Sequence, residues 1–161
     1  MPTDRIQGSL YTSIQNKVAT VEFGHPASNS FVSTLLQRLT DEINSLSKNE
    51  NVSVILLKSE GERAFCAGAS FDELVAISNP EEGKAFFSGF ANVINAMRNC
   101  KQTIVGRVQG KTVGGGVGLA AACDYVYATE AASIKLSEIT IGIAPLVIAP
   151  AVERKVGKAA L

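Results

Sequence analysis

Two features of this sequence could do chemistry together: a run of glycines and a single acidic residue that follows it. The glycines at 114–116 allow backbone N–H groups to approach a bound carbonyl closely. The small and apolar residues 117–123 predict a buried helix, and the N-terminus of a helix is a site for negative charge. Glu138 follows a short strand-like piece, 133–136, and is a candidate general base. An anion-binding helix end and a carboxylate are the groups needed to remove a proton from carbon beside a carbonyl.

A second loop of small residues, 65–70, is expected to lie beside the first. It follows the apolar run 52–57, which predicts a buried strand, and it leads into a short helix-like segment, 71–77. Ligands of α/β proteins usually bind at the carboxyl ends of parallel strands. We therefore expect the two loops, each after a strand of one parallel sheet, to converge with Glu138 on one binding site.

Other motifs match less well. The segment 106–112 is similar to a phosphate-binding P-loop but has three residues between its glycines, where that motif needs four. The pattern at 116–121 matches a dinucleotide fingerprint, yet residues 109–115 separate it from the preceding strand. His25 is the only histidine and lacks the nucleophile elbow of a serine hydrolase, so we expect it to pack in its loop. The sequence holds no cluster with metal-ligand spacing, and neither a metal nor a separate cofactor is predicted.

The remaining sequence predicts the elements that must hold these loops. Residues 10–15 and 18–23 alternate apolar and polar side chains about a turn, which predicts a hairpin. Helical spacing predicts a helix over 32–46, with Ser30 as its cap. Asn79, with the proline and acids after it, predicts the start of a long helix. The apolar residues expected on its inner face are Phe86, Phe87, Phe90, Val93, Ile94 and Met97. Strands over 103–108 and 125–129 complete an α/β domain with a largely parallel sheet.

Composition narrows the class of protein. The chain has 161 residues, 46% of them hydrophobic, which suits one domain with a substantial core. Basic and acidic residues number 15 each, which speaks against a nucleic-acid partner. The sequence shows neither a signal peptide nor an apolar segment long enough to span a membrane, so we expect a cytoplasmic protein without a membrane partner. Cys66, Cys100 and Cys123 are widely spaced and predict packed, free thiols.

Three segments together resemble the enoyl-CoA hydratase/isomerase family, also called crotonases. They are the loop 65–69, the run 114–124 and the segment 137–145, in the order and spacing of the family. The resemblance implies an α/β, crotonase-like fold, a spiral of β-β-α units of the ClpP/crotonase type. It begins near residue 12, and family members continue beyond this chain for roughly a hundred residues, about the size of a small domain. Because the chain also stops where a helix begins, we expect 1–161 to be a crotonase-like core domain, the N-terminal portion of a longer chain.

By motif position, the resemblance assigns roles to individual residues. The backbone N–H groups of Ala69 and Gly115 would form an oxyanion hole for a coenzyme A thioester, a feature worth about 3 kcal/mol per donor. Ala67 and Ser70 would lie with these residues along the path of coenzyme A, although the family commonly has aspartate in place of Ser70. Glu138 would be the catalytic base. Coenzyme A would enter as part of an acyl-CoA substrate, and the family suggests a homotrimer or hexamer when full length.

The choice of reaction depends on Gly118, a position where hydratases of the family commonly carry a second glutamate. Hydration needs one group to activate water and another, or the same one, to protonate the α-carbon, whereas isomerisation needs one base. Glu138 alone therefore favours an enoyl-CoA isomerase. The segments 116–120 and 143–150 instead resemble a methylglutaconyl-CoA hydratase-like branch that handles branched acyl chains. We favour a hydratase, a lyase of fatty-acid metabolism, with the isomerase and a non-catalytic CoA-binding protein as alternatives. We expect Gly118, as a helical residue, to accept glutamate with a gain of about 1 kcal/mol in stability.

Overall fold

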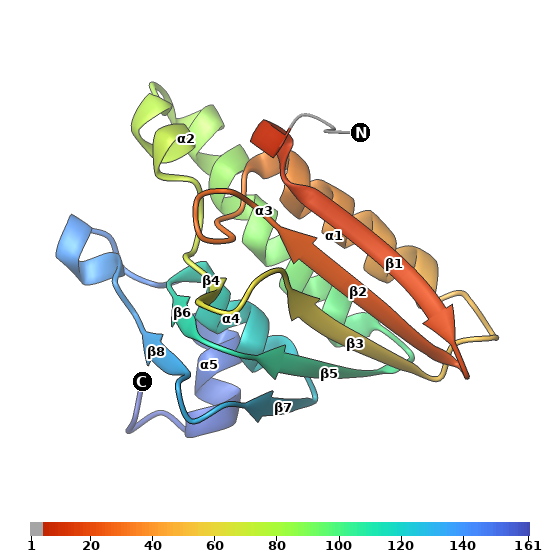
Figure 1. Cartoon of the computed structure of the whole chain (residues 1–161). Coiled ribbons are helices and arrows are strands. Elements are labelled where there is room, and N and C mark those ends of the chain that lie inside the picture. Colours follow the sequence, from red (N-terminus) through yellow and green to blue (C-terminus); the bar gives the residue numbers. More distant parts are fainter. Residues whose placement is uncertain (1–4) are drawn as a thin grey trace.

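The computed structural model describes residues 5–161, which form two sheets and a layer of helices (Figure 1). The larger sheet has the strand order β1-β2-β3-β5-β7. β1 pairs with β2 antiparallel, and the other neighbours pair in parallel. Asn16 and Lys17 form the predicted hairpin turn with φ of 50° and 63°. The strands are β1 (Ser9–Gln15), β2 (Val18–Gly24), β3 (Val54–Ser59), β5 (Thr103–Val108) and β7 (Tyr125–Ala128).

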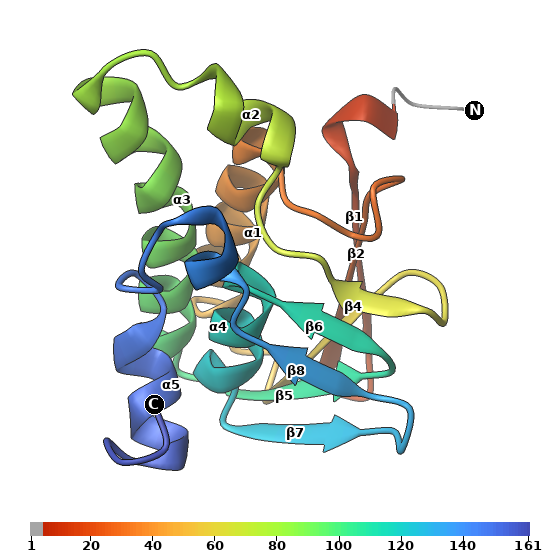
Figure 2. The same cartoon turned by 90° about the vertical axis from the view of Figure 1, so that its left-hand side faces the viewer.

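A smaller sheet of three parallel strands lies beside the larger one (Figure 2). Its strands are β4 (Ala64–Cys66), β6 (Lys111–Val113) and β8 (Ser133–Lys135). Along the chain, β3, β5 and β7 of the larger sheet are each followed by a strand of the smaller one and then by a helix. The spiral of β-β-α units is therefore confirmed. The prediction of a single sheet was wrong, because strands of three residues are too short to show an alternating pattern.

The helices form a layer over one face of the larger sheet. Neighbouring helices α1, α3, α4 and α5 contact one another in that order (Figure 2). Within residues 5–161, none of the helices is both long and apolar enough to cross a membrane. The helices are α1 (Ser33–Leu46), α2 (Phe71–Ala76), α3 (Pro80–Asn99), α4 (Gly115–Ala122) and α5 (Ala149–Val156), with two 3-10 turns, η1 (Arg5–Gln7) and η2 (Glu138–Ile141).

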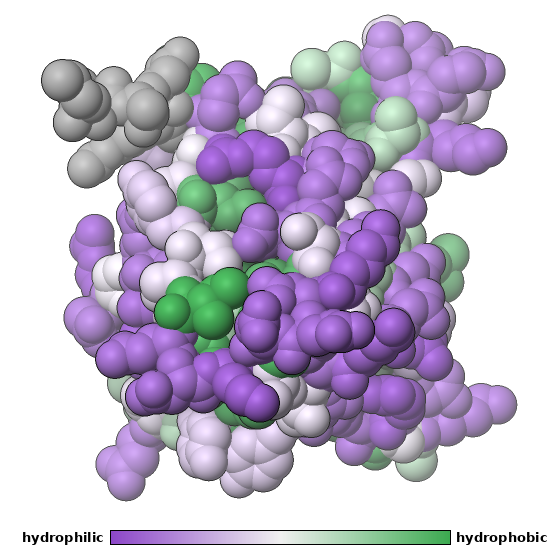
Figure 3. Space-filling model, turned by 90° about the vertical axis from the view of Figure 1, so that its right-hand side faces the viewer, coloured by the Kyte–Doolittle hydropathy of each residue, from purple (hydrophilic) through white to green (hydrophobic). Residues whose placement is uncertain are grey.

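The hydrophobic core lies between the helices and the larger sheet. On β2 and β3, alternate side chains are buried, which is the pattern of strands with one face on a core. The edge strand β1 exposes most of its side chains. The side of the molecule that lies on the right in Figure 1 is mostly hydrophilic (Figure 3), which disfavours pairing with another chain at that edge. The largest fully buried side chains include Phe23, Phe31, Phe65, Leu35, Leu39, Ile43, Ile55, Leu57, Ile104 and Leu119.

The two predicted helix caps had different outcomes. The side chain of Asn79 accepts a hydrogen bond from the Glu82 N–H at 2.9 Å, so the predicted start of α3 is confirmed. The prediction that Ser30 caps α1 was wrong. The carboxylate of Glu73 on α2 instead accepts hydrogen bonds from the N–H of Ser33, at 2.9 Å, and from its hydroxyl, at 2.6 Å. A cap supplied by another helix cannot be found from the sequence next to α1.

Candidate active site

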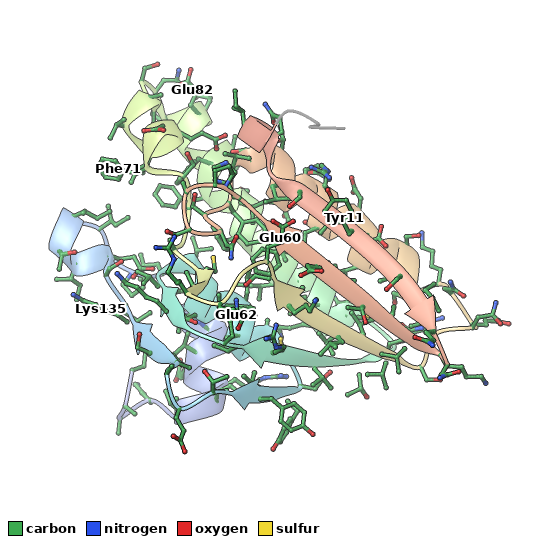
Figure 4. The ribbon with its side chains drawn as sticks, viewed as in Figure 1. Tyr11, Glu60, Glu62, Phe71, Glu82 and Lys135 are labelled. Carbon is green, nitrogen blue, oxygen red and sulfur yellow. The ribbon has the colours of Figure 1, made fainter. Side chains whose placement is uncertain are left out.

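A cavity of about 240 Å³ lies at the carboxyl ends of the strands of the smaller sheet. Residues 67–69 follow β4, residues 114–115 follow β6, and residues 137–138 follow β8, and all of them line this cavity. The three strands therefore bring the predicted loops and Glu138 together, as expected for parallel strands. Phe71, labelled in Figure 4, marks the α2 side of the cavity. The remaining lining residues are Leu74, Phe86, Phe87, Phe90, Ile141, Ile143, Ala144, Pro145, Val147 and Ile148.

Strand pairing explains why Glu138 reaches the cavity. β6 pairs with β8 so that Val113 is opposite Lys135, and the Gly114 N–H donates to the Lys135 carbonyl at 3.1 Å. Glu138 begins η2 just beyond, and its Oε1 lies 3.4 Å from the position that a β-carbon on Gly114 would occupy. Its Oε2 is buried and has no hydrogen-bond partner among residues 5–161. This oxygen is therefore free to accept a proton from a bound molecule.

The N-terminus of α4 supplies a backbone donor beside this carboxylate. Gly114 precedes the helix with φ of 54°, a conformation that glycine adopts at little cost. The first N–H groups of a helix have no acceptor within it, and in α4 the first of these belongs to Gly115. A β-carbon on Gly115 would lie 2.4 Å from the ring of Phe90. The absence of a side chain therefore allows the helix end to pack directly on that ring.

The loop after β4 supplies a second donor, which is oriented by pairing with Phe31. The Phe31 N–H donates to the Gly68 carbonyl at 2.8 Å, and the Ser70 N–H donates to the Phe31 carbonyl at 2.7 Å. Ala69 is thus the bridge partner of Phe31. In extended chain the N–H groups of successive residues point to opposite sides, so the N–H of Ala69 points away from Phe31.

The two donor segments lie against each other. The nitrogen of Gly115 is 3.7 Å from the position that a β-carbon on Gly68 would occupy. Ala67, Ala69, Gly115 and Glu138, four of the predicted site residues, line one cavity. Two N–H donors and a carboxylate between apolar walls can bind a carbonyl oxygen and move a proton at the neighbouring carbon.

Ser70 and Gly118 do not line the cavity. Ser70 is buried, and its hydroxyl caps α2 by accepting the Glu73 N–H at 3.3 Å. Gly118 is buried within α4, and a β-carbon there would lie 2.5 Å from Cγ2 of Ile148 and 3.1 Å from Cδ1 of Ile94. The expectation that a side chain at 118 would stabilise the protein is therefore corrected, because Ile148 already fills the space beside the helix.

Several lining residues were missed by the sequence analysis. Phe86 and Phe87 were expected in the core with Phe90, but they line the cavity, and Phe87 is 37% exposed. Phe86 and Phe87 precede Phe90 by four and three residues and so share its side of α3, and this side lines the cavity. Helical spacing alone does not distinguish a cavity wall from the core. The contact of Ile148 with α4 had no signal in the sequence.

The predicted free thiols are confirmed, and two of the three are buried. Desolvation raises the pKa of both Cys66 and Cys123 from 9.0 to about 12. At Cys66 the sulfur also accepts the Gly68 N–H at 3.3 Å, which acts in the opposite direction on the pKa. Both side chains are therefore neutral packing groups near the loop and the helix that form the site.

Known proteins share both the sequence pattern and the fold. The family described as enoyl-CoA hydratase/isomerase matches residues 13–161. Mitochondrial methylglutaconyl-CoA hydratase of Homo sapiens is 33% identical over 117 residues, which are 73% of this chain and 34% of that protein. Ethylmalonyl-CoA decarboxylase of Xenopus tropicalis is 28% identical over 135 residues, 83% of this chain and 45% of that protein. The crystal structure of enoyl-CoA hydratase from Bacillus anthracis matches with a TM-score of 0.86 and 26% identity, covering 96% of this chain and 60% of that one. The chain spans less than half the length of these two curated relatives.

Proposed function

This chain belongs to the enoyl-CoA hydratase/isomerase family, and we propose that the protein adds water to the double bond of a 2-enoyl-CoA thioester, straight or branched. The observation that carries the proposal is the position of Glu138. Its side chain lines the same cavity as Ala69 and Gly115, and its Oε2 is buried without a hydrogen-bond partner among residues 5–161. The hydratase among the relatives is a further argument for this reaction.

In the proposed reaction the thioester carbonyl oxygen accepts hydrogen bonds from the N–H groups of Ala69 and Gly115. The oxygen of water forms a bond to the β-carbon while Glu138 takes a proton from that water. The electron pair of the double bond moves toward the thioester, and the resulting enolate oxygen is held by the two donors. Glu138 then returns its proton to the α-carbon. One carboxylate thus accounts for both proton transfers.

The apolar walls have a chemical role in this scheme. Side chains such as Phe71, Phe87 and Ile148 line the cavity together with Glu138, and with an acyl group bound between them they would keep bulk water from the carboxylate. Hydrogen bonds to a developing negative charge are stronger in such a site than in water. The walls also suit a hydrocarbon acyl group, because burial of its apolar surface is favourable.

Isomerisation of a 3-enoyl-CoA is the second candidate, and a specific observation favours it. Ile148 fills the space beside Gly118, where a second carboxylate would have to lie. Glu138 would then remove the α-proton of the 3-enoyl-CoA, the two N–H donors would hold the dienolate, and the proton would return to the γ-carbon. That sequence needs one base only.

A single set of assays separates these possibilities. The purified protein is offered crotonyl-CoA, 3-methylglutaconyl-CoA and 3-hexenoyl-CoA, and the products are identified by mass spectrometry and chromatography. We expect a 3-hydroxyacyl-CoA from at least one of the 2-enoyl substrates. Conversion of 3-hexenoyl-CoA to the 2-enoyl isomer without hydration would replace the hydratase by the isomerase. Tight binding of all three esters without turnover would indicate a non-catalytic CoA-binding protein.

A further inference from the structure

The turn between β2 and α1 is tied to the rest of the sheet by one side chain, that of Asn29. Asn29 is 6% exposed and has φ of 58°. Its Oδ1 accepts the His25 N–H at 3.0 Å. Its Nδ2 donates to the carbonyls of Glu60, at 2.8 Å, and Ala64, at 2.9 Å. The amide therefore joins the end of β2, the end of β3 and the start of β4. Of its partners, Glu60 is labelled in Figure 4.

The backbone of the same turn holds the loop that carries Ala69. The Ser28 carbonyl accepts the Ala67 N–H at 3.1 Å. Phe31, two residues after Asn29, makes the two hydrogen bonds that bracket Ala69. The direction of the Ala69 N–H is therefore set by where the turn places Phe31.

Phe31 also connects this turn to the other donor segment. Its ring packs against Phe90 with a centroid distance of 5.8 Å and an interplanar angle of 73°. Phe90 is the residue whose ring lies where a β-carbon on Gly115 would be. A displacement of the turn would thus change the position of the Ala69 N–H relative to the Gly115 N–H.

We infer that Asn29 is a positioning residue for the oxyanion hole. Its amide fixes the turn so that the backbone of Phe31 aims the Ala69 N–H at the thioester oxygen. The inference rests on the proposed function, since it assumes that a carbonyl binds there. Asn29 does not line the cavity, and its effect on substrate passes through the turn.

Two substitutions at position 29 separate the effect of the amide hydrogen bonds from the effect of the left-handed backbone conformation. Asn29→Gly removes the amide but keeps the left-handed φ without strain. Asn29→Asp keeps the size and the acceptor, and replaces the two donor bonds by repulsion between its carboxylate and the carbonyl oxygens of Glu60 and Ala64. The Ala64 carbonyl still accepts a hydrogen bond from the side chain of Gln109 at 3.1 Å, which helps β4 to stay in place. Asn16→Gly is the matched control, because Asn16 has φ of 50° in the hairpin turn at the other end of β2.

Two readouts report on the carbonyl rather than on general stability. The first is the division of the effect between kcat and KM for the best of the three CoA esters. The second is the stretching frequency of the thioester carbonyl in the bound ester, labelled with carbon-13 and measured by difference infrared spectroscopy. We expect both Asn29 variants to lower kcat by about 10²-fold, as a displacement of about 1 Å can, with KM near the wild-type value. The carbonyl frequency of the bound ester should move toward that of the free ester. Asn16→Gly should change neither readout.

The outcomes distinguish the inference from the function on which it rests. A wild-type protein that binds the ester without lowering its carbonyl frequency would refute the oxyanion hole itself. A wild-type shift that is fully kept in folded Asn29→Gly and Asn29→Asp, with unchanged kcat, would overturn the role of Asn29 alone. If Asn29→Gly does not fold, Asn29→Asp decides the question, because its side chain has the same size. Glu138→Gln is the reference that should lose turnover and keep the shift.

Discussion

Replacement of Gly118 by alanine should destabilise the protein, although alanine is the better helix former. A β-carbon at 118 would lie 2.5 Å from Cγ2 and 2.8 Å from Cβ of Ile148. Both contacts are too short for the existing packing, and Ile148 is 3% exposed, so it has little room to move. Overpacking of a core costs about 1–3 kcal/mol, and the gain in helix propensity returns about 1 kcal/mol. With two such contacts we expect a net loss of about 1–2 kcal/mol for Gly118→Ala. Gly118→Glu should lose more, because it also buries a carboxyl group.

A second helical glycine provides the matched control. A β-carbon on Gly83 of α3 would have Ile77 as its nearest neighbour, at 3.7 Å, which is an ordinary contact. Gly83→Ala should therefore stabilise the protein by about 1 kcal/mol, the helix propensity alone. Urea denaturation followed by circular dichroism measures both changes. In an Ile148→Ala background, Gly118→Ala should destabilise less, because Cγ2 of residue 148, the closest clashing atom, is gone while its Cβ remains. Stabilisation by Gly118→Ala in the wild-type background, equal to that of Gly83→Ala, would refute the steric argument.

Further predictions concern the donor at the helix end and the buried thiols. Gly115→Ala should lower kcat by about 10²-fold, because its β-carbon would collide with the Phe90 ring and displace the donor N–H, and steady-state assays with the best CoA ester test this. Unchanged kcat in the folded variant would contradict the role of that N–H. The pKa of Cys66 and of Cys123 is raised from 9.0 to about 12, so the unfolded chain loses these protons first as pH rises. Stability should therefore fall between pH 9 and 12, by about 1.4 kcal/mol per pH unit for each thiol, and Cys123→Ala should reduce that slope in urea titrations at stepped pH.

The sequence was informative where a single local pattern decides the structure. The hairpin about Asn16, the cap at Asn79 and the buried helix predicted over 117–123 all depend on neighbouring residues, and all are present, although α4 begins two residues earlier, at Gly115. The strand predicted over 52–57 is β3, which begins two residues later, at Val54. Val52 is buried although it precedes the strand, so its apolar side chain extended the predicted range.

Features that depend on distant contacts were missed. The strands β4 and β6 are too short for periodicity to reveal, so the site was expected at the edge of the wrong sheet. Packing of Ile148 against Gly118 joins two helices, and no pattern within either segment encodes it. Four of the six predicted site residues line the cavity, whereas most of its apolar walls and the steric limit at Gly118 required the structure.

Transfer of solvent deuterium to the α-carbon tests the central claim most directly. Hydration in the proposed scheme places a proton from water on that carbon by way of Glu138 and the enolate. The wild-type protein in D₂O should give product with deuterium at the α-carbon, detected by mass spectrometry, and Glu138→Gln should lower that rate by about 10²–10⁴-fold while binding the CoA ester normally. Deuterium transfer by Glu138→Gln at the wild-type rate would contradict the account, because another group would then be the base.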